Sequence, residues 1–105
     1  MVNKHKKAYI SGKITGLPIE EYSKKFNKVE DYLRNKGYTN IINPIKINPY
    51  NPDWAWEDYM KPLIKELVDC DELWLISGWQ GSKGVEVELY LADTLGIKVI
   101  EYGRN

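Results

Sequence analysis

The apolar residues of this chain fall into two patterns that alternate along its length. Short apolar runs without a sustained polar face predict buried strands at residues 8–11, 39–42, 72–76 and 97–101. Apolar residues spaced three and four positions apart predict helices, at about residues 20–36 and 54–69, and from the end of a glycine-rich turn (77–84) to about residue 95.

This alternation predicts the fold class. Strands and helices follow one another with short connections and right-handed crossovers, which implies a parallel sheet covered by helices. We expect an α/β fold, a three-layer Rossmann- or flavodoxin-like sandwich whose four-stranded parallel sheet has the order 2-1-3-4, with helices on both faces. The length of 105 residues predicts a single domain over residues 1–105.

Two proline-containing stretches interrupt the pattern. Residues 43–53 hold three Asn-Pro pairs, so we expect neither a helix nor a central strand there but a structured loop. Such a loop is either a lid over the site or a passive connection. Pro62 falls inside the helix expected at 54–69, where it predicts a kink or the restart of a second segment.

Charge and composition argue against several classes of function. Fifteen basic and fifteen acidic residues cancel, without a basic block, which argues against binding to a nucleic-acid polymer. No apolar run approaches the roughly 20 residues of a membrane span, so we expect no membrane span and no signal peptide. The single cysteine, Cys70, fits a reducing cytoplasm and is interpreted as a core residue. His5 is the only histidine and the glycine loops match no dinucleotide or phosphate-loop motif, so we expect neither a metal nor a cofactor.

Candidate chemistry gathers in residues 70–96. Gly78, Gly81 and Gly84 let the chain turn after the third strand, and Ser82 stands at the expected N-cap of the following helix. Free amides and the helix dipole there predict an anion site. A second glycine loop, residues 11–16, follows the first strand. Because the order 2-1-3-4 makes the first and third strands neighbours at the topological switch point, we expect the two loops to meet in one crevice.

Glu88 is the main catalytic candidate in that crevice. It falls on the apolar arc of the helix, between Ala92 and Leu95 in angle. Burial there raises the pKa of a carboxyl group unless hydrogen bonds or a positive charge compensate. The alternative is a snorkelling or interface glutamate, and the position after a strand–turn–helix anion loop favours a functional role.

Short segments with a family resemblance occur in a fixed order along nearly the whole chain. They are Tyr9-Ile-Ser-Gly-Lys-Ile-Thr-Gly16, Phe26, Asn43-Pro44, Cys70-Asp71, Gly78-Trp79, Ser82-x-Gly84-Val85-x-x-Glu88, Ala92 and Gly96. This set resembles the nucleoside 2-deoxyribosyltransferase-like superfamily, which includes the 2′-deoxynucleoside 5′-phosphate N-hydrolases. The resemblance is greatest to its small, mostly uncharacterised bacterial and phage domains.

The resemblance implies cleavage of the N-glycosidic bond between a nucleobase and a deoxyribose, in a small-molecule nucleoside or nucleotide. It makes Glu88 the nucleophile on the anomeric carbon, in a retaining scheme with a second acid that assists the leaving base. The substrate-binding residues that it implies are Tyr9, Ser11, Gly12, Lys13, Ile14, Gly16, Asn43, Trp79, Ser82 and Gly84.

The resemblance also implies dimers whose pockets lie near the subunit boundary. Aromatic and apolar residues that we expect at the surface support a homodimer or a higher homo-oligomer. They are Trp54, Trp56, Tyr59, Val87 and Tyr90.

Two positions depart from the family's pattern. Leu63 stands where an aspartate usually assists the leaving base, and Asp58 takes that catalytic role only if Pro62 redirects the helix. Lys13 replaces a proline, and it either meets a phosphate or points to solvent. Two functions therefore stay open: an N-glycoside hydrolase or 2-deoxyribosyltransferase, and a non-catalytic module that senses or sequesters a nucleotide. A third, weaker interpretation is a protein-interaction scaffold that uses residues 52–59.

Overall fold

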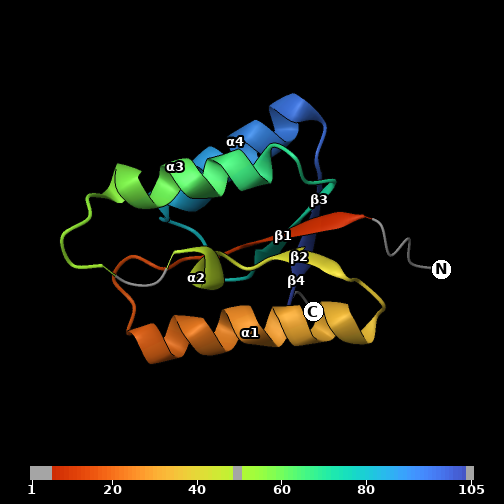
Figure 1. Cartoon of the computed structure of the whole chain (residues 1–105), viewed down its shortest axis with the longest axis horizontal. Helices are drawn as coiled ribbons and strands as arrows, with labels where there is room; N and C mark the ends of the chain where they lie inside the picture. Colours follow the sequence, from red (N-terminus) through yellow and green to blue (C-terminus); the bar gives the residue numbers. More distant parts are fainter. Residues whose placement is uncertain (1–5, 49–50, 104–105) are drawn as a thin grey trace.

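A computed structural model describes residues 6–48 and 51–103, so His5 and Pro49 lie outside the described residues. Its four strands form one parallel sheet in the order β2-β1-β3-β4, as predicted (Figure 1). The strands are β1 (Lys7–Ser11), β2 (Asn40–Ile42), β3 (Glu72–Ile76) and β4 (Lys98–Tyr102). The central strand β1 pairs with β2 on one side and with β3 on the other, which puts the ends of β1 and β3 side by side.

Helices cover both faces of the sheet, which confirms the three-layer sandwich. Helix α1 (Ile19–Asn35) lies on one face, and α3 (Trp56–Leu67) and α4 (Lys83–Leu95) lie on the other (Figure 1). Side chains alternate along a strand, so Ala8 and Ile10 pack under α1. Tyr9 and Ser11 point the other way, and Tyr9 belongs to the core under α3 and α4. The two hydroxyl groups of β1 therefore lie on the side of α4.

The observed element ends agree with the predicted ones to within about two residues, and the caps explain several of them. Gly96 ends α4 in the left-handed conformation, with φ of 73°, and Ser82 is its N-cap. Cys70 is buried before β3, and burial raises the pKa of its thiol to about 12, which suits a core residue.

The prediction that residues 43–53 contain no helix is wrong for one turn, α2 (Pro44–Ile47). Pro44 takes the first helical position, where no N–H is needed, and the Asn43 side chain accepts a hydrogen bond from the Ile45 N–H at 3.3 Å. Of the two alternatives predicted for Pro62, a kink or a restart, the restart does not occur, because α3 is one helix with Pro62 in its interior.

Within the described residues, none of the helices is both long enough and apolar enough to cross a membrane.

Candidate active site

Glu88 is buried at the interface between α4 and β1, with only 5% of its surface exposed. The Tyr9 hydroxyl donates a hydrogen bond to Glu88 Oε2 at 2.5 Å, and the Ser11 hydroxyl donates one to Glu88 Oε1 at 2.7 Å. Tyr9 and Ser11 reach the same carboxylate because they are two residues apart on one strand. Both oxygens of Glu88 are therefore held in a fixed orientation by rigid secondary structure.

Burial dominates the electrostatics of this carboxylate. It raises the pKa of Glu88 to about 7, although the hydrogen bonds from Tyr9 and Ser11 act in the opposite direction. Burial and the neighbouring Glu88 charge raise the pKa of Tyr9 well above 10, so Tyr9 stays a hydrogen-bond donor at neutral pH. Near pH 7, Glu88 therefore exists in both its ionised and its protonated form.

Glu88 faces a cavity of about 500 Å³ that is lined in part by the loops that follow β1 and β3. The wall comes from the loop after β1, the first half of α1, α2, α3 and the start of α4. It is predominantly apolar and aromatic, and Glu88 is the only carboxylate among the described residues that line it. An apolar cavity with a few converging polar groups is the usual form of a small-molecule site.

Two glycines keep the cavity wall compact. A Cβ atom at Gly12 would lie 2.9 Å from Ile76 Cδ1 and 3.1 Å from Phe26 Cζ, closer than such atoms normally approach. A Cβ atom at Gly84 would lie 3.3 Å from Met60 Sδ. The sheet, α1 and α3 can therefore approach the two loops only because these positions carry no side chain.

The structure brings most of the residues implied by the resemblance to this cavity. Gly12, Ile14, Gly16, Ser82, Gly84 and Glu88 line it. Tyr9 and Ser11 lie behind the wall, where they contact Glu88. The Ser82 hydroxyl accepts a hydrogen bond from the Val85 N–H at 3.3 Å, so it caps α4 at the cavity edge.

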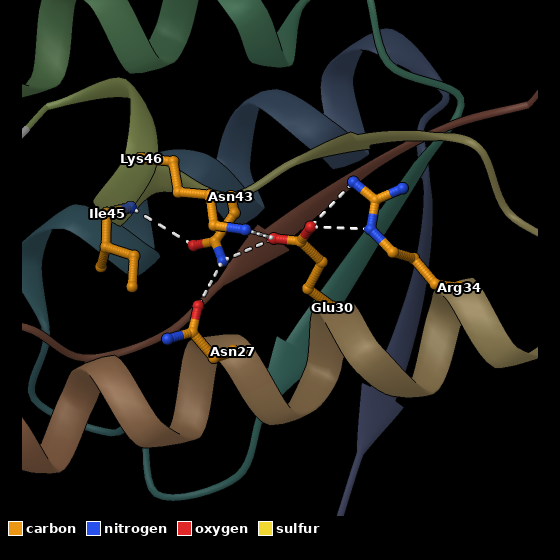
Figure 2. Close-up of polar contacts among 6 residues, drawn as sticks. All are labelled: Asn27, Glu30, Arg34, Asn43, Ile45 and Lys46. Carbon is orange, nitrogen blue, oxygen red and sulfur yellow. Dashed lines mark hydrogen bonds and ion pairs between the residues drawn. The ribbon is translucent and has the colours of Figure 1, made fainter.

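Besides Tyr9 and Ser11, three of the implied residues do not line the cavity, namely Lys13, Asn43 and Trp79, and neither does Asp58, the alternative acid. Trp79 packs against the core under α3 and α4. Asn43 bonds to Asn27 and Glu30 (Figure 2). The exposed Asp58 accepts a hydrogen bond from the Ala55 N–H at 2.9 Å, as a cap of α3. As placed here, Asp58 does not replace the missing aspartate, and Leu63 lines the cavity at that position.

Several aromatic wall residues were missed by the sequence interpretation, among them Tyr22, Trp56 and Tyr59. Trp56 and Tyr59 were expected at the surface, and Tyr22 was given no role in the site. The signal that marks them as site residues is their position in the first turns of α1 and α3, beside the glycine loops. The Lys83 ammonium lies 4.1 Å from the centroid of the Trp56 ring, a cation–π contact at the rim.

Comparisons with known proteins identify a family and a relative in fold. The profile described as "Domain of unknown function (DUF4406)" matches residues 6–101. A solved structure, the 2-deoxyribosyltransferase from the psychrotolerant bacterium Bacillus psychrosaccharolyticus, superposes with a TM-score of 0.69 at 20% sequence identity. The superposition covers 94% of this chain and 75% of that enzyme, and at this identity it shows a shared fold. No curated protein sequence matches the chain.

Proposed function

The chain belongs to the family described as Domain of unknown function (DUF4406), and from that premise we propose its function on the geometry of its site. The protein cleaves the N-glycosidic bond of a nucleoside or nucleotide, by hydrolysis or by transfer of the 2-deoxyribosyl group, with Glu88 as the nucleophile. The observation that carries this proposal is the buried Glu88 carboxylate, held by Tyr9 and Ser11 and facing the cavity as its only lining carboxylate among the described residues. The shared fold with a 2-deoxyribosyltransferase supports the same reaction class.

The proposed reaction follows the two-step scheme of retaining glycosidases. The ionised Glu88 attacks the anomeric carbon, and the bond to the base breaks with its electron pair going to the base nitrogen, which takes up a proton. Water, or the nitrogen of a second base, then attacks the anomeric carbon and releases Glu88. Because the attack needs the ionised carboxylate, the rate should fall as the pH drops below about 7, the pKa of Glu88.

The wall of the cavity suits the two ends of such a substrate. Tyr22, Trp56 and Tyr59 offer aromatic surface to a planar base. Ser82 and Gly84, at the amino end of α4, offer polar groups to sugar hydroxyls or to a phosphate. The anomeric carbon of a ligand bound in this way lies between the two, next to Glu88.

A second candidate function is a non-catalytic module that binds a nucleoside or nucleotide. The specific observation in its favour is Leu63, because a leucine in the wall supplies no proton to the leaving base. Asp58 is held as a helix cap. Losing the acid of such a pair typically slows a reaction by about 10²–10⁴-fold.

One experiment separates the two functions. The protein is incubated with the common deoxynucleosides and their 5′-monophosphates, and released base is measured by chromatography while thermal shifts report binding. Base release that disappears in Glu88→Gln, but not in the exposed same-helix control Glu86→Gln, supports the enzyme. Thermal stabilisation without base release supports the binding module. No stabilisation and no release by any member of the panel would refute both.

A further inference from the structure

A cluster of polar residues around Glu30 joins α1 to the segment that follows β2 (Figure 2). Glu30 is 5% exposed, and its carboxylate accepts hydrogen bonds from three side chains. Asn43 Nδ2 donates to Glu30 Oε1 at 3.0 Å, and the Lys46 ammonium lies 2.9 Å from the same oxygen. The Arg34 guanidinium bonds to Glu30 Oε2 at 2.8 Å.

The partners of Glu30 fix α2 in place. Asn43 caps α2 and Lys46 lies within it, whereas Arg34 belongs to α1 itself. A single helical turn is not stable alone, so α2 depends on contacts of this kind. At its other end, Asn48 Nδ2 donates to the Tyr59 carbonyl at 2.7 Å, which ties the segment to α3.

This short helix is also a wall of the ligand cavity. Pro44, Ile45 and Asn48 line the cavity between α1 and α3. A displacement of α2 by the width of one side chain would therefore change the shape of the site, without any change at Glu88 itself.

We propose that Glu30 is a positioning residue for the ligand site: through Asn43 and Lys46 it holds α2 against α1, and so sets the wall that a bound ligand contacts. This inference rests on the proposed function, since it supposes that a nucleoside or nucleotide occupies the cavity. It also assigns Asn43 a role different from substrate contact. Both hydrogens of its amide are used, one toward Glu30 and one toward Asn27 at 3.2 Å, and its oxygen caps α2.

The attraction between Glu30 and Lys46 of α2 is present at all ordinary pH values. Burial alone would raise the pKa of Glu30, but the hydrogen bonds from Lys46, Asn43 and Arg34 outweigh it and lower the pKa to about 2. Glu30 thus stays charged, and it attracts the Lys46 ammonium of α2 under any condition in which the protein is assayed.

The two cations on Glu30 provide a matched pair of variants. Lys46→Met removes the cation that comes from α2, and Arg34→Met removes the one that comes from α1. Both side chains are more than half exposed, at 61% and 51%, so neither change should prevent folding. Glu30→Gln removes the centre of the cluster. Glu72→Gln is its control, since Glu72 is 4% exposed and accepts from Tyr38, Trp74 and Lys6 away from the cavity.

The first measurement is amide hydrogen exchange of residues 46–48 in the ligand-free protein, where Lys46 and Asn48 donate to Asn43 and Pro44. Lys46→Met and Glu30→Gln should speed this exchange by about threefold to tenfold, while Arg34→Met and Glu72→Gln leave it within about twofold. Equal exchange in Lys46→Met and Arg34→Met would overturn the proposal, whatever the function of the protein.

The second measurement is the apparent affinity for the deoxynucleoside and 5′-monophosphate panel, with KM and kcat where base is released. Lys46→Met should raise KM or the dissociation constant several-fold and leave kcat within about twofold, because Glu88 and its partners are untouched. An unchanged affinity despite faster exchange would overturn the positioning role. The remaining outcome is faster exchange of the α2 amides in Lys46→Met and Glu30→Gln, together with an unmodified protein that binds no member of the panel. In that case the proposed function fails, and with it the positioning of a nucleoside, but the conclusion that Glu30 holds α2 in place is kept.

Discussion

Replacing Glu88 with glutamine should remove a loss of stability that the protein suffers as the pH rises through neutrality. The folded protein raises the pKa of Glu88 from 4.5 to about 7, so it binds the Glu88 proton more tightly than the unfolded chain does. For a carboxyl group with a raised pKa, the stabilising contribution is complete below pH 4.5 and is lost as the pH rises to about 7.

The size of this loss follows from the two pKa values. At about 1.4 kcal/mol per pKa unit, the difference between 4.5 and about 7 corresponds to about 3 kcal/mol of unfolding free energy. That is a large share of the roughly 5–15 kcal/mol that stabilises a typical domain. Glutamine does not ionise, and its amide can still pair with one of the two hydroxyls of Tyr9 and Ser11. The exchange therefore adds a pH-independent offset of about 1 kcal/mol.

Urea unfolding of the unmodified protein and of Glu88→Gln, at steps from pH 4 to pH 8.5, tests the reasoning. The difference between their unfolding free energies should change by about 3 kcal/mol in favour of the variant between pH 4.5 and pH 8, because all other titrating groups cancel. Glu86→Gln, which changes an exposed carboxyl group on the same helix, is the matched control. A flat difference for Glu88→Gln would mean that the pKa of Glu88 is not raised and that its burial is not as described.

Three further predictions concern other parts of the molecule. Gly12→Ala should lower the unfolding free energy by about 1–3 kcal/mol, because the new Cβ atom is too close to Ile76 and Phe26. Thermal unfolding measures this loss of stability, and an unchanged melting temperature would contradict the close packing. Leu63→Asp should raise the rate of base release if the protein has lost only the acid, and it should lower the stability because it places a carboxylate in the apolar wall. A variant that folds and binds ligand but releases no base would show that the missing acid is not what limits turnover. Tyr90 and Trp54, exposed by 71% and 38%, support a homodimer, which light scattering at micromolar concentration should show; a monomeric mass would refute it.

The features that were predictable from the sequence are those governed by periodicity. Residues 72–76 are apolar without a polar face, which a strand buried on both sides requires, and β3 occupies those residues. The burial of Glu88 follows from its angle on the helix, and Ser82 caps α4 as its residue type suggests. Sequence spacing and turn chemistry are enough for these features because they depend on nearby residues.

The features that were missed depend on partners far away in the chain. Asn43 followed by a proline is typical of a turn, but here it caps α2 and bonds to Glu30, thirteen residues before it. Asp58 was weighed as a catalytic acid, whereas its carboxylate accepts a hydrogen bond from the N–H of Ala55, the N-cap residue of α3. A short polar side chain can serve a local cap or a distant site, and only the tertiary arrangement decides between them.

The three buried carboxylates of the described chain differ in their partners, and this difference supports the proposal that Glu88 is a site residue rather than a structural one. Burial would raise the pKa of Glu30, but hydrogen bonds from Lys46, Asn43 and Arg34 lower it. Burial would raise the pKa of Glu72 as well, but hydrogen bonds from Trp74, Tyr38 and the ammonium of Lys6 lower it, so each of these carboxylates has at least one cation beside it. Glu88 is buried to the same extent, but its described partners are the neutral hydroxyls of Tyr9 and Ser11.

A carboxylate that served only packing would gain stability from a cation or from replacement by an apolar residue. Glu88 instead keeps a destabilising, ionisable group in the wall of a cavity that a ligand can enter, which is the pattern expected of an active site. A ligand with an electron-poor carbon at that point, such as the anomeric carbon of a nucleoside, would meet a carboxylate that has little competing solvation. In the proposed reaction, the raised free energy of the buried carboxylate would lower the barrier to attack, and with Leu63 in the wall the proton for the departing base would come from water.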